Sequence, residues 1–374
     1  MTTFIEVHAL QTMPPSNINR DESGSPKTAV YGGVVRARVS SQAWKQAMRK
    51  HFETSLDPEL RGVRTLRVLE ALLKQMGDAV PDQTAAIEQA TEVLKAAGIG
   101  VKAPRAKKGE AEPGPEKFVS EALVFLSNQQ LRRLAEMALS DEPIDKKKAK
   151  EAADQDHGVE VGLFGRMVAS SPDLNVDAAV QVAHAISTHE VEPQADFYTA
   201  VDDFKRANDE DDSGAGMMGT IEFNSSTLYR YGVVDVDQLQ RNIGSAEVTA
   251  QAAGTFVRSF IESMPTGKQN TFAGQSRPEF VLVRVRTDRP LSLANAFEEA
   301  VADQGRGHFR GSVAKLADHA QRLEAAYGGG VSHSWLVSVD DHGDILEGLG
   351  DRVSLDTLAE KVEQEALRQV GESA

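Results

Sequence analysis

The sequence predicts an α+β protein, and three observations carry this prediction. Apolar and polar residues alternate near both ends of the 374-residue chain, as they do in half-buried strands. Residues 56–100 and 116–155 instead repeat apolar residues at helical spacing, interrupted by Gly and Pro. The chain exceeds the roughly 250–300 residues at which a single core stops growing, so we expect more than one lobe. These patterns predict an α+β core that carries a helical lobe.

Local patterns predict the individual elements. Residues 5–9 alternate as a first strand, and FVLVRVR at residues 280–286 alternates as a later one. Residues 245–264 place four apolar side chains, from Val248 to Phe260, on one stripe of an amphipathic helix. Further strands are expected at residues 34–40, 225–236 and 333–339, and further helices at residues 40–52, 292–301 and 354–370.

Composition excludes several classes of site. Lys and Arg number 41, Asp and Glu 56, and the net charge is −15. So acidic a protein does not bind nucleic acid over its whole surface, and such a function needs local basic patches. The absence of cysteine excludes a thiol nucleophile and cysteine-bound metal, and we expect no cofactor. No apolar run of about 18 residues and no signal-peptide pattern occur, so we expect a cytoplasmic protein without membrane contact.

Residues 27–50 form the most unusual segment, because they contain six basic residues and no acid. Within this segment the strand over residues 34–40 places Val35, Ala37 and Val39 on one face. Arg36 and Arg38 lie on the opposite face. The basic residues of the segment are Lys27, Arg36, Arg38, Lys45, Arg49 and Lys50.

The helix expected after this strand has an apolar and a polar face. Ser40 or Ser41 is a suitable N-cap. At 100° per residue, Trp44, Ala47, Met48 and Phe52 share one face, and Gln42, Lys45 and Arg49 share the other. The helix N-terminus offers unpaired backbone N–H groups and partial positive charge, both of which attract phosphate. An ordinary amphipathic surface helix is the alternative; the absence of acids favours phosphate or a nucleic-acid backbone.

The region from residue 190 to 219 has the opposite charge. Residues 190–212 contain nine acids against Lys205 and Arg206, a net of 2 − 9 = −7, and end in the acidic run Asp209 to Asp212. That composition predicts a solvated loop, and a divalent-metal site of the two-metal nuclease kind is the alternative. Gly214–Gly219 matches G-x-G-x-x-G, but it follows an acidic loop and precedes an extended stretch, so we expect a hairpin tip.

The remaining basic and ring-bearing residues have simpler interpretations. Residues 102–108 form a basic surface loop, and residues 145–150 open a helix. His184 and His189 are expected to be core or surface histidines, because a spacing of five does not place them on one helix face. The pattern alone interprets Phe197 and Tyr198 as a packing pair.

Four stretches, including NINRDESGSPKTAVYGGVVRARVSSQAWKQAMRK, resemble the CasC family, the backbone subunit of the type I-E CRISPR surveillance complex Cascade. They occur in the family order, between residues 17 and 301 of the chain. The stretches are residues 17–50, 162–204, 219–234 and 289–301.

This resemblance implies an architecture like a right hand. It consists of a modified RRM/ferredoxin-like palm, a helical fingers insert and a thumb β-hairpin. The implied boundaries are residues 1–54 for the first part of the palm, 55–180 for the fingers, 181–224 for the thumb and its flanks, and 225–374 for the second part of the palm.

The resemblance also implies a function in antiviral defence. Copies of the chain stack along one CRISPR guide RNA beside other Cascade subunits. Each thumb crosses the RNA and flips out one nucleotide, and the guide pairs with target DNA. A separate helicase–nuclease is recruited to cut, so the chain is expected not to be an enzyme. A repeat-associated, metal-dependent ribonuclease using Asp209 to Asp212 and a phosphate-cofactor enzyme using Gly214–Gly219 are the alternatives.

The resemblance assigns roles to individual residues. Contacts to duplex DNA fall on the lysine run of the fingers. The aromatic pair falls on the thumb. We expect the acids Asp209 to Asp212 either to meet a basic patch of the neighbouring copy, such as the region of Arg36 and Arg38, or simply to stay solvated. The implied RNA-binding residues are Asn19, Arg20, Lys27, Ser40, Gln42, Lys45, Arg49, Arg166, Met167, Phe197 and Tyr198, and the implied DNA contacts are Lys146, Lys147, Lys148 and Lys150.

Overall fold

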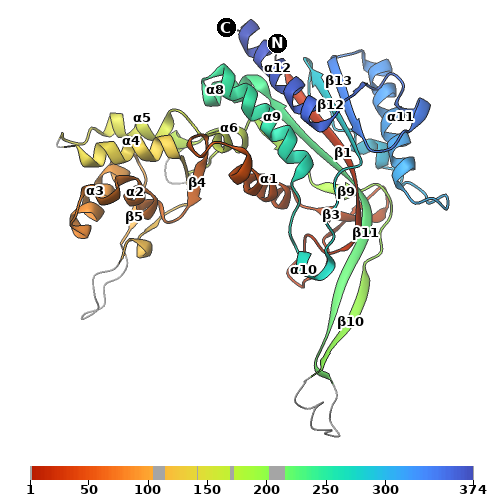
Figure 1. Ribbon diagram of the computed structural model, residues 1–374, viewed down its shortest axis with the longest axis horizontal. Coiled ribbons are helices and arrows are strands. Elements are labelled where there is room, and N and C mark those ends of the chain that lie inside the picture. Colours follow the sequence, from red (N-terminus) through yellow and green to blue (C-terminus); the bar gives the residue numbers. More distant parts are fainter. Residues whose placement is uncertain (1, 104–113, 141, 169–171, 202–214, 374) are drawn as a thin grey trace.

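A computed structural model describes residues 2–103, 114–140, 142–168, 172–201 and 215–373. It confirms a mixed α+β protein built on one large sheet, with a helical lobe at its side (Figure 1). We call the sheet with its covering helices the palm, the helical lobe the fingers, and the projecting hairpin the thumb. The RRM/ferredoxin-like arrangement of the palm and the domain boundaries stay predictions.

The palm contains a ten-stranded sheet in the described part of the chain, ordered β14-β13-β12-β1-β11-β9-β3-β2, with β8 and β10 paired to β11. β1 and β11 are the long central strands, antiparallel along β1 from Phe4 to Ser16. The strands are β1 (Phe4–Ser16), β2 (Thr28–Tyr31), β3 (Val34–Val39), β8 (Val180–Val182), β9 (Ala185–Ser187), β10 (Gln194–Val201), β11 (Ala215–Asp235), β12 (Phe280–Arg286), β13 (Val331–Ser338) and β14 (Asp351–Arg352).

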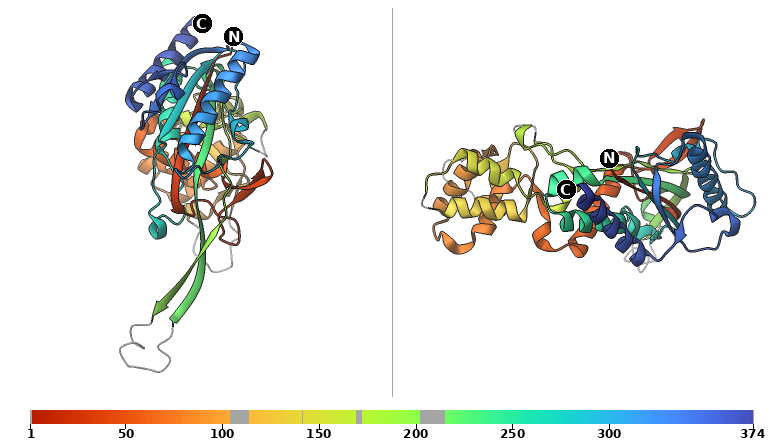
Figure 2. Two further views of the ribbon diagram at one scale, coloured as in Figure 1. Left: turned by 90° about the vertical axis from the view of Figure 1, so that its right-hand side faces the viewer. Right: turned by 90° about the horizontal axis from the view of Figure 1, so that it is seen from above.

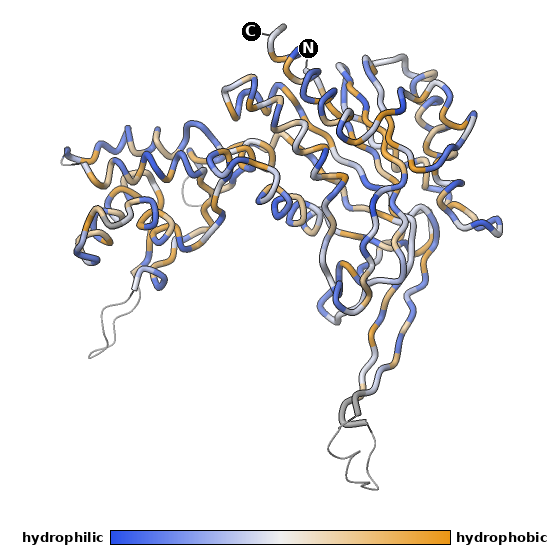
Figure 3. Tube along the Cα trace, in the orientation of Figure 1, coloured by the Kyte–Doolittle hydropathy of each residue, from blue (hydrophilic) through white to orange (hydrophobic). Residues whose placement is uncertain are grey.

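Helices cover both faces of this sheet, which explains why every residue of β12 is buried. One face packs against α1, α8, α9 and α12 through residues such as Trp44, Phe256 and Phe260. The other face packs against α11 through Phe297 and Leu316. Figure 3 shows hydrophobic residues along the strands of the sheet and in parts of the helices. The palm helices are α1 (Ser41–Ser55), α8 (Val236–Ile243), α9 (Ala246–Glu262), α10 (Gln269–Phe272), α11 (Phe309–Tyr327) and α12 (Leu355–Ser373).

The fingers have a core of their own. Its apolar side chains, such as Leu72, Leu94 and Leu134, form a cluster separate from those of the palm. Seen from above, palm and fingers lie at opposite ends of the molecule (Figure 2). The elements here are β4 (Gly62–Thr65), α2 (Val68–Met76), α3 (Gln83–Ala96), β5 (Val101–Lys102), β6 (Val119–Ser120), β7 (Val124–Ser127), α4 (Asn128–Leu139), α5 (Lys146–Asp154) and α6 (Val159–Phe164).

The thumb is the hairpin of β10 and the first half of β11. Its antiparallel register runs from Gln194 opposite Phe223 to Val201 opposite Ala215, and both strands project away from the palm (Figures 1 and 2). The expected surface run at residues 102–108 falls partly, and the acidic run Asp209 to Asp212 entirely, outside the described residues.

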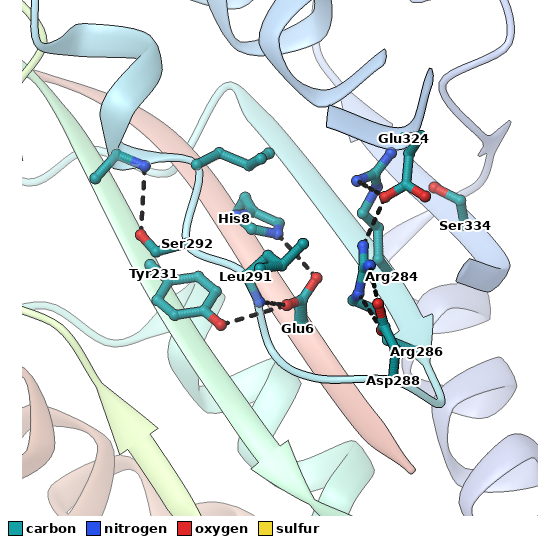
Figure 4. A network of polar contacts seen from close by, with 12 residues as sticks. Glu6, His8, Tyr231, Arg284, Arg286, Asp288, Leu291, Ser292, Glu324 and Ser334 are labelled. Carbon is teal, nitrogen blue, oxygen red and sulfur yellow. Dashed lines mark hydrogen bonds and ion pairs between the residues drawn. The ribbon is translucent and has the colours of Figure 1, made fainter. Parts of the chain in front are cut away.

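A buried polar network fixes the chain after β12 against the palm sheet (Figure 4). The carboxylate of Glu6 accepts hydrogen bonds from the backbone N–H of Leu291 and from the Tyr231 hydroxyl. The imidazole of His8 lies 3.6 Å from the same carboxylate, and burial lowers its pKa. Arg286 binds Glu324 at 2.6 Å. These contacts hold the segment that leads to a short 3-10 helix at Ala294–Phe297.

Most of the predicted elements are confirmed. Residues 245–264 form α9 with Ser245 as its N-cap, and the helix expected over residues 40–52 is α1. The helix expected at residues 292–301 is wrong, because only the 3-10 turn forms there. In the described ranges no helix is both long and apolar enough to cross a bilayer.

Candidate nucleic-acid interface

The α1 helix presents its polar face as the sequence predicts. Ser40 is its N-cap, and the Ser40 hydroxyl accepts a hydrogen bond from the backbone N–H of Ala43 at 3.3 Å. The apolar face is buried, including Trp44 and Met48. Gln42 is exposed, while Lys45 and Arg49, the other members of the polar face, are half-buried. The polar face therefore stays accessible beside the helix N-terminus.

The turn before β2 brings three of the predicted residues, Asn19, Arg20 and Lys27, to this N-terminus. The Asn19 side chain accepts a hydrogen bond from the backbone N–H of Ser40 at 2.9 Å, and the Asn19 carbonyl accepts one from that of Lys27 at 3.0 Å. Arg20, the next residue, is exposed. Asn19 thus ties the basic turn to the start of α1, and we call this surface the N-terminal strip (Asn19, Arg20, Lys27, Ser40 and Gln42).

Arg36 corrects the sequence analysis, because it is completely buried and belongs to no surface patch. Its guanidinium donates to the carbonyls of Tyr31, Ser187, Phe297 and Glu298 at 2.9 to 3.3 Å. Val35, on the opposite face of β3, is 39% exposed. The prediction that Arg36 and Arg38 together form a docking patch is therefore wrong.

Arg36 joins three segments that lie beside the hairpin of β2 and β3 or shortly before the thumb. Tyr31 ends β2, and Ser187 ends β9, a few residues before the thumb begins. Glu298 lies against the turn between β2 and β3, where a Cβ on Gly32 would lie only 1.7 Å from the Glu298 carbonyl oxygen. Gly32 is required there both for that approach and for its φ of 61°. The hydrogen bonds of the buried Arg36 guanidinium consequently fix the hairpin of β2 and β3 against the rest of the palm.

A cleft of about 700 Å³ separates the other side of α1 from the fingers. Lys45 lines it with its ammonium 5.9 Å from the Phe164 ring centre, and burial lowers the pKa of Lys45. The Arg49 guanidinium lies 4.7 Å from the centre of the Phe125 ring and 3.2 Å from the Glu160 carboxylate. The cleft therefore combines positive charge with aromatic surface, the combination that suits a single-stranded nucleic acid.

Arg166 and Met167 reach the same cleft in different ways. Arg166 is only 5% exposed, and its guanidinium donates to the Leu174 carbonyl at 2.6 Å and to Asp154 at 2.9 Å. Met167 is 80% exposed. The buried Arg166 therefore stabilises the turn after α6, and Met167 is the exposed side chain of this turn at the cleft. Arg64 of β4 also lines the cleft, and the sequence analysis missed it because a lone arginine in a short strand carries no signal.

The two thumb aromatics are not equivalent. Phe197 is 63% exposed and lies directly opposite Thr220. Tyr198 lies opposite Gly219, and a Cβ on that glycine would be 2.5 Å from the Tyr198 hydroxyl. The tyrosine ring therefore covers the glycine of the neighbouring strand. The described part of the G-x-G-x-x-G match is β-strand, not a nucleotide-binding turn.

Comparison with known proteins identifies the family. The family model Cas_CT1975, described as CT1975-like protein, matches residues 5–361. The chain belongs to this family of Cas proteins. No curated protein matches it.

Solved structures support the same assignment for this CT1975-like chain. A chain of a "CRISPR RNA-guided surveillance complex, pre-nicking" has 34% identity and a TM-score of 0.84, covering 97% of this chain and 100% of its own. A chain of a "CRISPR RNA-guided surveillance complex" has 29% identity and a TM-score of 0.72, covering 96% and 99%. The CT1975-like chain is thus similar over nearly its whole length to chains of such complexes.

In this CT1975-like chain the lysine run opens α5, far from α1 (Figure 1). Asp145 caps the helix by accepting from the backbone N–H of Lys147. The Lys147 ammonium lies 3.9 Å from Glu151, and that of Lys150 lies 3.1 Å from Asp173. Both interactions are between exposed groups and are weak. The run is therefore a basic surface separate from the cleft.

The histidines and acids of the described residues form no metal site. No group of three or more candidate ligands comes together in the part of the chain that the structure describes. His189 is buried and stacks on His308 with ring centres 3.6 Å apart, and desolvation by burial lowers its pKa to about 4. His184 lies 3.2 Å from the Arg38 guanidinium. His189 is thus a core histidine, as one of the two sequence interpretations expects.

Proposed function

We propose that this chain is the non-catalytic, guide-RNA-binding backbone subunit of a type I-E Cascade surveillance complex. Its copies would stack along one CRISPR guide RNA, each gripping the ribose–phosphate backbone. The complex would then recognise target DNA by base pairing with the guide. This assignment follows the resemblance to the CasC family and agrees with the chain's similarity to chains of RNA-guided surveillance complexes.

One observation carries the proposal: α1 has candidate phosphate-binding groups along its length. The N-terminal strip lies at its start, and Lys45 and Arg49 line the cleft beside its middle. Contacts to phosphate and sugar carry no sequence information, which suits a subunit that must accept any guide. An acidic surface elsewhere limits binding to other nucleic acids.

The proposed role of the thumb rests on its exposed phenylalanine. A hairpin that crosses the RNA must unstack a base, which costs a few kcal/mol. Stacking on an aromatic side chain returns about 1–3 kcal/mol per base. Phe197 is exposed enough to make this contact. Tyr198 instead packs over Gly219 of the neighbouring strand. Met167 presents a second exposed apolar side chain at the cleft.

The proposed partners follow from the same role. They are the guide RNA, the target DNA, further copies of the chain, the other Cascade subunits and the recruited helicase–nuclease. The exposed lysines of α5 are the proposed contacts to duplex DNA: Lys146, Lys147, Lys148 and Lys150. We further propose that the complex acts in the cytoplasm, where the guide RNA and invading DNA meet.

The direct test is the nucleic acid that accompanies the purified protein. We expect the absorbance ratio at 260 and 280 nm to reveal bound RNA, and denaturing gels to show RNA of one length. A ribonuclease would instead lose that RNA when magnesium is added, and a phosphate-cofactor enzyme would release a nucleotide on heating. Protein free of RNA from cells that express the guide would contradict the proposal.

A second test addresses catalysis. Assembled complex with guide and matched DNA, incubated in magnesium without the helicase–nuclease, should leave both nucleic acids intact. Cleavage that disappears when Asp209 to Asp212 are replaced by the corresponding amides would overturn the non-catalytic assignment.

A further inference from the structure

A second cleft, of about 440 Å³, lies along α1, and none of the implied RNA-binding residues lines it. One wall is α1 itself, with Gln46 and Lys50. The other wall is the segment after α9, from Ser263 to Gly267. Ile18 completes the lining at the base of the basic turn.

This cleft continues the N-terminal strip. A Cβ on Gly267 would lie 2.4 Å from the Ile18 carbonyl oxygen, so the segment after α9 is pressed against the residue that precedes Asn19. Along α1, Gln42, Gln46 and Lys50 are spaced four residues apart and are all exposed. Residues at this spacing form one stripe on a helix surface. The stripe leads from the proposed phosphate contacts at the helix start directly into the cleft.

The lining has the chemistry of a ribose–phosphate site. Lys50 has no ion-pair partner among the described residues, and Gln46 offers both a donor and an acceptor. Ser263 is only 6% exposed, and within the described structure its hydroxyl has no hydrogen-bond partner. A buried hydroxyl without a partner is unusual. The Ser263 side chain can rotate about χ1 toward a ligand without breaking an existing hydrogen bond.

Bases are not what this cleft suits. Its lining contains no Phe, Tyr or Trp on which a base would stack, and its apolar part consists of short side chains and Met264. The imidazole of His51, which also lines it, already binds Ser259 at 2.9 Å and lies 3.5 Å from Glu262. The chemistry that remains is one cation for a phosphate and hydroxyl and amide groups for a sugar.

We propose that this cleft is a ribose–phosphate subsite for the guide RNA, with Lys50 on a phosphate and Ser263 and Gln46 on the adjacent 2′-hydroxyl. The inference rests on the proposed function and deepens it, because a contact to the 2′-hydroxyl distinguishes RNA from DNA. The subunit then holds the guide strand in preference to a DNA strand without reading any base.

The test compares full-length wild-type protein with Lys50→Ala, Ser263→Ala and the control Lys361→Ala, a lysine of α12 that does not line the cleft. The probes are one single-stranded RNA and the DNA of the same sequence, titrated at several salt concentrations. Lys50→Ala should lower the salt slope by about 0.7 for RNA, because it removes one phosphate contact. Lys361→Ala should leave the slope unchanged.

Ser263→Ala should keep the salt slope but reduce the RNA-to-DNA affinity ratio about fivefold, the effect of one net hydrogen bond. Its melting temperature without RNA should not fall, because the hydroxyl has no internal partner to lose. A purely structural serine would show the reverse: a lower melting temperature and an unchanged ratio. That result, or a Lys50→Ala slope equal to the Lys361→Ala slope, overturns the subsite.

The Lys45→Ala variant separates failure of the subsite from failure of the proposed function. If Lys45→Ala weakens RNA binding while the Lys50 and Ser263 variants do not, the subsite is wrong and the RNA-binding function stands. If wild-type protein binds neither strand, both are wrong.

Discussion

Two neighbouring basic elements, the β3 strand and the α1 helix, have opposite environments. Both belong to the same acid-free segment, and only Ser40 separates them. In β3, Arg36, which was expected to belong to a basic surface patch, is completely buried, whereas Val35 on the apolar face of the strand is 39% exposed. In α1 the predicted faces are confirmed, with Trp44 and Met48 buried. A basic residue in this segment is therefore not a nucleic-acid contact merely because of its charge.

The difference has a physical cause. A helix at the edge of a core buries one stripe, and the 3.6-residue period identifies that stripe. A strand has two faces, and in a sheet covered on both sides either of them can be buried. Arg36 is accommodated because four backbone carbonyls from three segments accept its protons, a condition invisible in the local sequence.

The largest expected effect is that of Arg36→Met, which leaves those carbonyls without their charged donor. We expect the free energy of unfolding to fall by about 3 kcal/mol or more, since hydrogen bonds to charged groups contribute about 1.5–3 kcal/mol each. Chemical denaturation measures this, with Arg38→Met as the control because Arg38 is only half-buried. An equal loss of unfolding free energy in Arg36→Met and Arg38→Met would contradict the different roles of the two arginines.

Acid should weaken the buried region selectively through His189. The pKa of this imidazole is lowered from 6.5 to about 4, mainly by burial and also by the nearby His308 and Arg36, while the hydrogen bond to the Glu190 carbonyl and the charge of Asp303 oppose the shift. The folded state therefore binds a proton at His189 less readily than the unfolded state does. This stabilisation is complete above about pH 6.5 and is lost as the pH falls toward 4, by about 3 kcal/mol.

His189→Asn tests this pH dependence. Denaturation between pH 7 and pH 4 should show a shallower loss of stability for His189→Asn than for wild type, whatever its stability at neutral pH. His184→Gln, at an exposed position beside Arg38, is the control and should follow the wild-type curve. A wild-type curve that is flat across this window would contradict the prediction.

Arg49 sharpens the comparison, because it is the residue of α1 most like Arg36. Its partner Glu160 is only 4% exposed, and the carboxylate also accepts a hydrogen bond from the backbone N–H of Gly62 at 2.9 Å. Arg49→Ala should therefore cost about 1–3 kcal/mol of stability, and Lys45→Ala much less. Adding Glu160→Gln should restore part of the loss, measured as the coupling in a double-mutant cycle. No coupling would mean that the ion pair is not formed in solution.

The smallest effect on stability is expected at the thumb. Phe197→Ala should leave unfolding unchanged, because the side chain is 63% exposed, yet reduce the chemical reactivity of the flipped guide nucleotides. Tyr198→Ala should cost about 1 kcal/mol, because the ring covers Gly219 across the hairpin. If Phe197→Ala keeps every flipped position, the phenylalanine is not the wedge.

Long, periodic elements were predictable from the sequence. The alternation of β12 and the stripe of α9 each reflect one repeating geometry, so the expected ranges agree with the observed ones to within a few residues. The 3-10 turn in place of a helix at residues 292–301 was not predictable. That segment is fixed by Glu6 and accepts from Arg36, both distant in sequence.

The candidate site was predictable only where local chemistry determines it. The N-cap at Ser40 and the polar face of α1 follow from the sequence directly. The burial of Arg166 and the participation of Arg64 in the cleft do not, because both depend on how the fingers pack against α1. The carbonyls that surround the Arg166 guanidinium come from several segments of the chain.

The most direct test of the account is the salt dependence of RNA affinity for wild type, Lys45→Ala and Arg36→Met. A lysine on a phosphate should lower the slope of log affinity against log salt by about 0.7 for single-stranded RNA when removed. A buried arginine that only holds the hairpin should lower the affinity and leave the slope unchanged. The account predicts this separation. An unchanged slope for Lys45→Ala together with a lower one for Arg36→Met would contradict it.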